Sequence, residues 1–304
     1  MLRKITKKIL SLVMVVLMFY SLSSVQIFAY TLTDVALGRQ VLLDSGWSPE
    51  EIDDLLTDEV IAKYASATSV GYEKKFYRVE ENGAVEITEE ECDEEIDNIA
   101  HQIFDEVEMI ANGSVAAPCL APGTDTKDEE ITEDGYFTSY VRVYAYGGGD
   151  FILQARFEWL ITPSNRKLDV FALRNSISLL PGDRDDIYYV YKADVTNYLP
   201  SSQYTATIEN PDSMFTDDNG VVITQDLIDD SVLSTATNHR GYVEYPASIA
   251  NSNALRAAAY SYYYHQETTF EVTPSISFDG PSVTVTPTTK FKFMEPNTYV
   301  QFEV

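Results

Sequence analysis

Three histidines are the side chains in this sequence best suited to acid–base or metal chemistry. His101 has Asp97 and Asp105 four residues to either side, a spacing that places all three groups on one face of a helix. A metal site there would need a further ligand, and the sequence nominates none. We therefore expect a solvated histidine between two carboxylates.

His239 and His265 belong to the second half of the chain, where the residue pattern is extended. His239 lies between Asn238 and Arg240, and His265 follows three consecutive tyrosines. Either imidazole has the chemistry of a general base. No serine elbow, zinc-binding helix motif or cysteine–histidine pair of known spacing accompanies them, so a structural hydrogen bond is the favoured role.

A run of tyrosines before His265 is the most unusual local feature of a chain that holds 21 tyrosines. In a strand, Tyr260, Tyr262 and Tyr264 face one side, and His265 faces the other. An exposed row of phenol rings could stack on sugars or contact a protein, whereas a buried row would belong to a sandwich core. The candidate binding residues are Tyr260, Tyr262, Tyr264, His265 and His239.

Two acidic turns, at residues 183–186 and 217–220, carry the oxygen atoms that calcium prefers. Neither completes the spacing of a calcium-binding loop, and Asp, Asn and Gly are common in turns for conformational reasons. We predict no resident cofactor, with calcium as an alternative. The 48 acidic residues also make a pair of neighbouring carboxylates inevitable, so such a pair cannot by itself indicate a glycosidase.

Cys92 and Cys119 are the two cysteines of the chain. If residues 89–111 form a helix, Cys92 lies about 28 Å along its axis from Ala111. The chain from Ala111 to Cys119 spans only about 26–29 Å when fully extended. A disulfide would require this segment to run straight back along the helix, so it is the less favoured alternative.

The first 29 residues have the pattern of an export signal. Four basic residues within positions 3–8 precede an uncharged apolar run over positions 9–20. Ala29 is a suitable residue before the cleaved bond, although Ile27 is larger than usual two positions earlier. An uncleaved membrane anchor is the alternative, which the polar residues at 21–26 disfavour. We expect a secreted protein without membrane attachment after cleavage.

The charge of the chain limits its partners. Cleavage after residue 29 would remove four of the 21 basic residues and none of the 48 acidic ones, so the mature protein is even more negative than the −27 of the full sequence. Nucleic acid and anionic lipid are therefore disfavoured. A cation or a basic protein surface is electrostatically acceptable.

Residues 30–111 are predicted to form a helical and hairpin N-terminal region. Short helices are expected over 31–66, where Ser48, Pro49 and Glu51 supply an N-cap, a first-turn proline and a capping box. Extended patterns over 68–79 and 85–87 indicate a hairpin. Apolar residues at helical spacing then predict a long amphipathic helix that begins after Thr88.

Residues 112–135 lose this periodicity and collect Gly, Pro and acidic residues, as linkers do. From residue 136 the period becomes two, and the clearest hairpin joins 136–146 to 151–161 across three glycines. Further short strands and turns follow. The sequence thus predicts an α+β protein: a small helical N-terminal region with a long amphipathic helix, followed by an antiparallel β-sandwich over 136–304.

Five segments carry a resemblance to a known group of proteins: Leu43–Ile52, Phe157–Ser164, Lys167–Phe171, Asn238–Gly241 and Tyr264–Glu267. Together they resemble exported proteins of Gram-positive clostridia and bacilli to which no activity is assigned. The resemblance implies an extracellular location and neither a cofactor nor a site.

The expected function is non-enzymatic binding or interaction outside the cell, with a carbohydrate or another extracellular protein as partner. A secreted hydrolase that uses carboxylates or a histidine is one alternative. A calcium-dependent surface protein is the other.

Overall fold

The structure is a computed structural model that describes residues 30–80, 83–111, 133–163, 165–250, 253–266, 274–286, 291–295 and 297–304. It forms two compact units, Met1–Ser66 and Ala67–Val304. The predicted export signal and nearly all of the predicted linker lie outside the described residues. Within the described part of the chain, no helix combines the length and the hydrophobicity of a membrane span.

The first unit is a small helical cluster. It contains α2 (Leu32–Asp44), α3 (Pro49–Leu55), α4 (Asp58–Lys63) and the 3-10 turn η1 (Tyr64–Ser66). The Glu51 N–H donates to Ser48 Oγ and the Ser48 N–H donates to a Glu51 carboxylate oxygen, which confirms the predicted capping box. Gly38 lets α2 approach α4, because a Cβ there would lie 1.9 Å from the Ile61 carbonyl oxygen.

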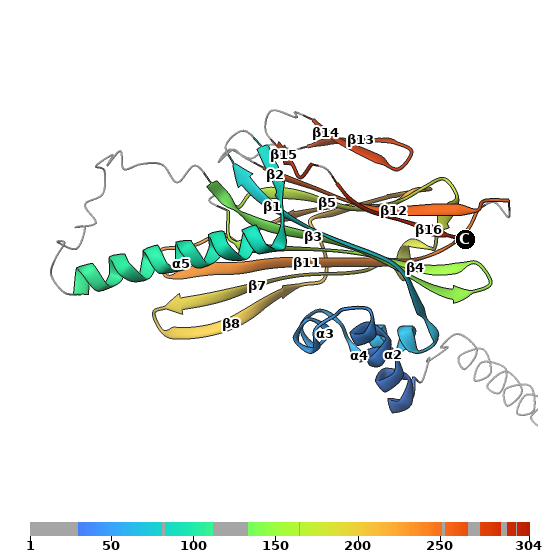
Figure 1. Cartoon of the computed structure of the whole chain (residues 1–304), viewed down its shortest axis with the longest axis horizontal. Helices are drawn as coiled ribbons and strands as arrows, with labels where there is room; N and C mark the ends of the chain where they lie inside the picture. The colour runs from blue at the N-terminus through green and yellow to red at the C-terminus, as the bar shows by residue number, and fades with distance from the viewer. Residues whose placement is uncertain are drawn as a thin grey trace, which may run out of the picture. The chain divides into compact units, whose positions relative to one another are not determined.

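The second unit is built from antiparallel sheets (Figure 1), which confirms the predicted β architecture. Sheet A has the order β2 (Gly83–Ile87), β1 (Thr68–Glu80), β3 (Glu133–Gly147), β4 (Asp150–Ile161), β11 (Ser234–Ile249), β7 (Tyr188–Tyr198) and β8 (Ser201–Ile208), with β6 (Leu179–Pro181) paired to β11. Sheet B has the order β15 (Phe291–Phe293), β12 (Arg256–Gln266), β5 (Leu168–Asn175), β10 (Gly220–Asp226) and β9 (Ser213–Asp217), with β16 (Thr298–Glu303) also paired to β12.

The inner faces of the two sheets share one hydrophobic core. Phe137 and Phe157 of sheet A meet Phe171 and Tyr263 of sheet B, and all four rings are buried. The centroids of Phe137 and Tyr263 are 4.4 Å apart, and those of Phe157 and Phe171 are 5.0 Å apart. Burial of a side chain of this size contributes about 2–3 kcal/mol, so these contacts hold the sheets together.

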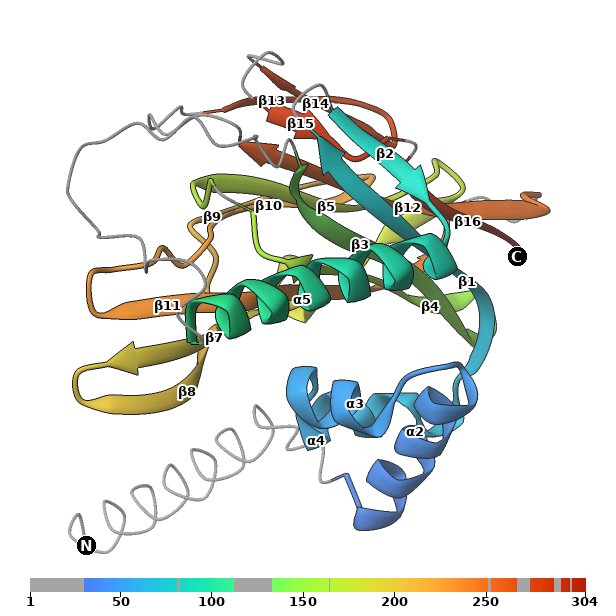
Figure 2. The ribbon, with the colours of Figure 1, turned by 60° about the vertical axis from the view of Figure 1, so that its left-hand side comes forward.

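Helix α5 (Glu89–Ala111) packs against the outer face of sheet A, as Figure 2 shows. Its buried Cys92 forms a small apolar cluster with Phe76 of β1 and Tyr136 of β3. The Thr88 hydroxyl accepts from the Glu91 N–H, which confirms the predicted start of the helix. Ion pairs from Lys74 and Arg78 to glutamates of α5 add charge complementarity at its first turns.

The division between compact units differs from the predicted one. Strands β1 and β2 form the expected hairpin, but β1 also pairs with β3 along nearly its whole length, from Thr68 opposite Ala145 to Glu80 opposite Glu133. The hairpin and α5 therefore belong to the β unit, and the boundary falls at Ser66–Ala67. Local periodicity reveals a hairpin, but it contains no information about which distant strand completes the sheet.

A separate hairpin, β13 (Ser275–Asp279) and β14 (Ser282–Thr286), covers the outer face of sheet B. Val283 and Val285 pack against Tyr262 and Tyr264 in a second apolar cluster. The Tyr264 hydroxyl donates to the Val283 carbonyl oxygen over 2.6 Å. This hairpin therefore shields Tyr262 and Tyr264 from water.

Candidate ligand-binding pocket

Two of the three tyrosines considered as a binding row lie beneath this hairpin. Tyr262 and Tyr264 are each 8% exposed, so both follow the buried alternative and not the exposed one. Tyr260 is half-buried and stacks on Tyr299, with 6.0 Å between the ring centroids. The alternation along β12 is as predicted, but the sequence did not indicate that a later hairpin folds over this face.

His265 faces the core, where Asp169 organises a buried hydrogen-bond network. Its Nδ1 is 2.9 Å from Asp169 Oδ1, which also accepts the Gln266 N–H at 3.1 Å. The Tyr263 hydroxyl donates to Asp169 Oδ2 and accepts from Trp159 Nε1 at 3.0 Å. The Asp169–His265 pair has the composition of a catalytic dyad, but it is buried and not among the residues that line the pocket described below.

His239 has a separate buried environment. Its Nδ1 is 2.7 Å from the Tyr191 hydroxyl, which also accepts the Ile228 N–H. Burial, with the charge of Arg166 as a second cause, lowers the pKa of His239 to about 4. The ring is therefore neutral at physiological pH, and the predicted structural hydrogen bond is observed.

His101 lies exposed on α5, and Asp97 is exposed beside it. The side chain of Asp105 lies outside the described residues, as does Cys119, so neither the His101 cluster nor the cysteine pair is tested in full. Within the described residues, no three His, Cys, Asp or Glu side chains are grouped as a metal site requires.

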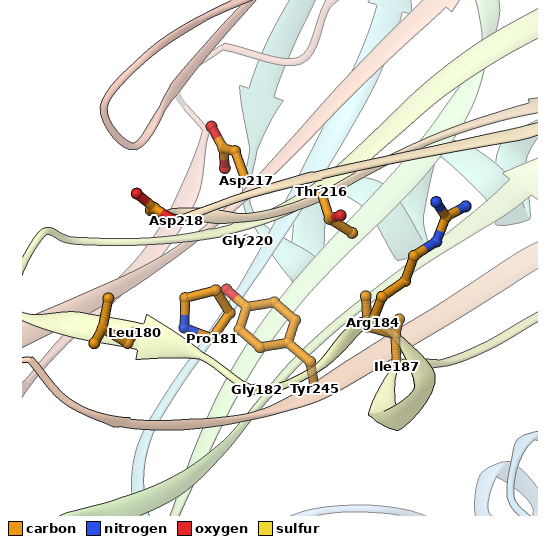
Figure 3. A pocket seen from close by; sticks show the side chains of 10 residues that line it. All are labelled: Leu180, Pro181, Gly182, Arg184, Ile187, Thr216, Asp217, Asp218, Gly220 and Tyr245. Atoms are coloured by element: carbon orange, nitrogen blue, oxygen red, sulfur yellow. The ribbon is translucent and has the colours of Figure 1, made fainter.

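A pocket of about 400 Å³ lies at the rim where the two sheets approach each other (Figure 3). Strands β6 and β11 of sheet A, the 3-10 turn η2 (Arg184–Asp186) and the β9–β10 turn of sheet B form its walls. Its polar lining comes from Thr216, Asp217, Asp218, Arg184 and the Tyr245 side chain. Its apolar and backbone lining comes from Leu180, Pro181, Gly182, Ile187 and Gly220.

The β9–β10 turn is shaped by its own residues. Asp217 Oδ1 accepts the Asn219 N–H at 2.9 Å, a typical Asx interaction in a turn. Gly220 follows with φ +123°, and a Cβ there would lie 2.7 Å from the Tyr245 hydroxyl oxygen. Only glycine fits this backbone and this approach, so Gly220 permits the buried Tyr245 to lie against the β9–β10 turn.

Arg174 fixes the orientation of Asp217 from behind the pocket. Its guanidinium is fully buried and donates to both Asp217 oxygens, over 2.5 and 2.8 Å, and to the Gly280 carbonyl oxygen over 2.9 Å. Partial burial alone would raise the pKa of Asp217, but the Arg174 and Asn219 hydrogen bonds outweigh it and lower the pKa. Asp217 is therefore a preorganised carboxylate.

The two acidic turns singled out in the sequence both border this pocket. Arg184 comes from the first, and Asp217 and Asp218 come from the second, with Arg184 on the opposite side from the two aspartates (Figure 3). Tyr245 and Pro181 carry no sequence signal, because they reach the pocket only through the pairing of β11 with β6. The acidic turns were thus the one detectable part of the site.

Comparison with known proteins places the chain in no family. No family model matches it, and no curated protein matches it significantly. Among solved structures, it is similar to the collagen-binding domain from a Staphylococcus aureus adhesin, at 10% identity, over 43% of this chain and 83% of that domain, with a TM-score of 0.22. A TM-score this low carries no argument about function.

Proposed function

We propose that this chain is a secreted, non-enzymatic binding protein that holds a saccharide unit in the pocket at the rim of the sandwich. The lining of that pocket carries the proposal: two carboxylates, a guanidinium and the Thr216 hydroxyl lie beside the apolar side chains of Leu180, Pro181 and Ile187. A sugar presents the same mixture, since its hydroxyls donate and accept hydrogen bonds and its C–H faces are apolar. The volume of about 400 Å³ is in the range of small-molecule sites.

The charges of the pocket favour a neutral sugar over an acidic one. Asp217 and Asp218 outnumber Arg184 in the lining, and the whole chain has a formal charge of −27. A carboxylated or phosphorylated sugar would be repelled. A neutral sugar meets no such cost and can donate hydroxyls to the aspartates.

Binding without cleavage is supported by the state of Asp217. A glycosidase needs one carboxylic acid with a raised pKa that can protonate the leaving group. The pKa of Asp217 is lowered instead, and both of its oxygens already accept hydrogen bonds from Arg174. The two histidines of the β unit lie buried elsewhere, so the lining offers no imidazole as an alternative acid.

Calcium is a second candidate ligand because both acidic turns border the pocket. The guanidinium of Arg174, however, holds both Asp217 oxygens in the hydrogen bonds described above. A cation would have to compete with that buried ion pair. We therefore treat calcium as a variable in the binding experiment and not as the proposed ligand.

Titration calorimetry of the mature protein with a panel of neutral oligosaccharides tests the proposal. Asp218→Ala and Arg184→Ala should each weaken binding about tenfold, which corresponds to the loss of one charged hydrogen-bond partner. Asp185→Ala is the matched control, because Asp185 lies in η2 but does not line the pocket. Failure of all sugars to bind, equal loss in the control, or cleavage of the sugar would contradict the proposal.

Two further measurements complete the test. Repeating the titration with added calcium and with a chelator separates a calcium requirement from direct sugar binding. Sequencing the N-terminus of the protein recovered from the culture medium tests secretion, and we expect it to begin at Tyr30, as the export signal predicts. Full-length protein retained in the cytosol with Met1 intact would contradict an extracellular role.

A further inference from the structure

Strand β8 is an edge strand that lacks the usual protection against pairing with another chain. In the described residues its one strand partner is β7, which leaves its other side open. Edge strands normally avoid unwanted pairing through shortness, charged side chains, proline or bulges. β8 has eight residues in continuous register with β7, and none of them is charged or proline.

Three other edge strands of sheets A and B are better protected. At the opposite edge of sheet A, β2 is five residues long and contains Glu86, which pairs with Lys75. In sheet B, β9 has five residues and ends at Asp217, and β15 has three residues and contains Lys292. β8 is thus longer than each of these edges and lacks their charges.

The direction of the free hydrogen-bonding groups on β8 follows from its neighbour. The Tyr198 N–H donates to the Leu233 carbonyl oxygen at 2.8 Å, so the backbone of Tyr198 faces away from β8. Backbone groups alternate along a strand, and Tyr198 pairs in register with Ser201. The backbone groups of Ser201, Gln203, Thr205 and Thr207 therefore face the open edge.

Exposed apolar side chains lie at the tip of the β7–β8 hairpin. Leu199 is 73% exposed and Val232 is 97% exposed, and Tyr198, Tyr204 and Leu233 are each about half exposed. The hydrogen bond between Tyr198 and Leu233 joins the tip to the segment that precedes β11. An open strand edge thus lies next to apolar side chains that the described residues of this chain leave exposed to solvent.

We propose that β8 binds an extended segment of a partner protein as an added antiparallel strand, and that this segment carries alternating apolar residues with basic residues beside them. Main-chain hydrogen bonds to the open edge would supply affinity, and contacts with the exposed tip would supply specificity. The charge near the edge indicates the sign of the partner, because Glu209 and Asp212 are exposed just beyond β8. The formal charge of −27 disfavours a second copy of the chain as the partner.

The test uses the mature protein and a synthetic peptide of alternating valine and threonine with lysine at both ends. Fluorescence anisotropy should detect binding, and hydrogen exchange should slow at the amides of Gln203, Thr205 and Thr207. The same peptide with glutamate ends should bind at least about tenfold more weakly. If exchange at these amides slows without peptide, and slows further as the protein concentration rises, β8 pairs with a second copy of the chain. That result would overturn the proposal.

Thr205→Pro removes one outward N–H and leaves the β7 hydrogen bonds, so it should weaken peptide binding at least about tenfold. Thr205→Ala is its matched control, because it removes the same side chain, including its hydroxyl contact with Asp194, but keeps the N–H. Gln203→Lys is a second variant for the case that Thr205→Pro does not fold. It places a cation on the edge, leaves the backbone unchanged and should weaken binding of the lysine-ended peptide. Peptide binding that survives both Thr205→Pro and Gln203→Lys would overturn the proposal.

Discussion

Two aspartates in the β unit, Asp169 and Asp217, have contrasting surroundings. Asp169 lies in the core, where its side chain is 3% exposed and accepts from Tyr263, His265 and Gln266. Asp217 lies at the rim, where its side chain is 31% exposed and paired with Arg174. The core cluster has the residue types of a catalytic site, whereas the rim cluster borders a pocket. Access to a ligand, more than residue type, separates the two.

The largest expected effect is that of removing the core carboxylate. Asp169→Ala should lower the free energy of unfolding by about 4 kcal/mol, because several buried donors lose their acceptor. Asp169→Asn keeps one acceptor oxygen and should cost less. Urea denaturation measures both. A loss below about 1 kcal/mol for Asp169→Ala would mean that the core network is not structural.

The buried histidine should make stability depend on pH. Burial lowers the pKa of His239 to about 4 from 6.5, so the unfolded chain takes up a proton first as the pH falls. The contribution of neutral His239 to the free energy of unfolding is fully present above pH 6.5. It is lost between pH 6.5 and 4, by about 3 kcal/mol in total. Urea denaturation at several pH values should show this loss in the wild type and a smaller one in His239→Gln. His101→Gln, at an exposed position, is the matched histidine-to-glutamine control against which the effect of His239→Gln is compared.

Removing the guanidinium behind the pocket should have an intermediate effect. Arg174→Met leaves Asp217 and the Gly280 carbonyl oxygen without their shared donor, so we expect a loss of about 2 kcal/mol of unfolding free energy. Hydrogen exchange should also become faster in β13 and β14. Unchanged exchange in that hairpin would show that the Arg174 contact does not hold it in place.

The smallest effect on stability is expected at the exposed rim. Asp218 is exposed, so Asp218→Ala should change the free energy of unfolding by less than about 0.5 kcal/mol. Its expected effect is on sugar binding alone. A large loss of stability in this variant would remove the distinction between a structural core carboxylate and a ligand-facing rim carboxylate.

Local features of the fold were predictable from the sequence. The capping boxes at Ser48 and Thr88 fix helix starts through contacts three residues apart, and the glycine-rich β3–β4 turn fixes a hairpin. The pairing of β1 with β3 was not predictable, because their residues are separated by the long segment that contains α5. Local patterns determine elements, but packing between distant segments determines their neighbours.

The candidate site was predictable only in part for the same reason. The acidic turns indicated oxygen-rich loops, yet nothing local placed Arg184 opposite Asp218 across a pocket. The tyrosines of β12 were recognisable as an alternating row, but their exposure depended on β13 and β14 folding back over them. Solvent exposure is a property of the assembled fold, so the sequence pattern alone could not decide between an exposed and a buried row for Tyr262 and Tyr264.

The thiol of Cys92 gives α5 a built-in chemical reporter. It is fully buried, and that burial, with acidic neighbours as a further cause, raises its pKa to about 11. Very little thiolate exists at neutral pH while the helix is docked. A thiol-specific dye should therefore label Cys92 only when α5 lifts from sheet A, and the rate of labelling would report how often this happens.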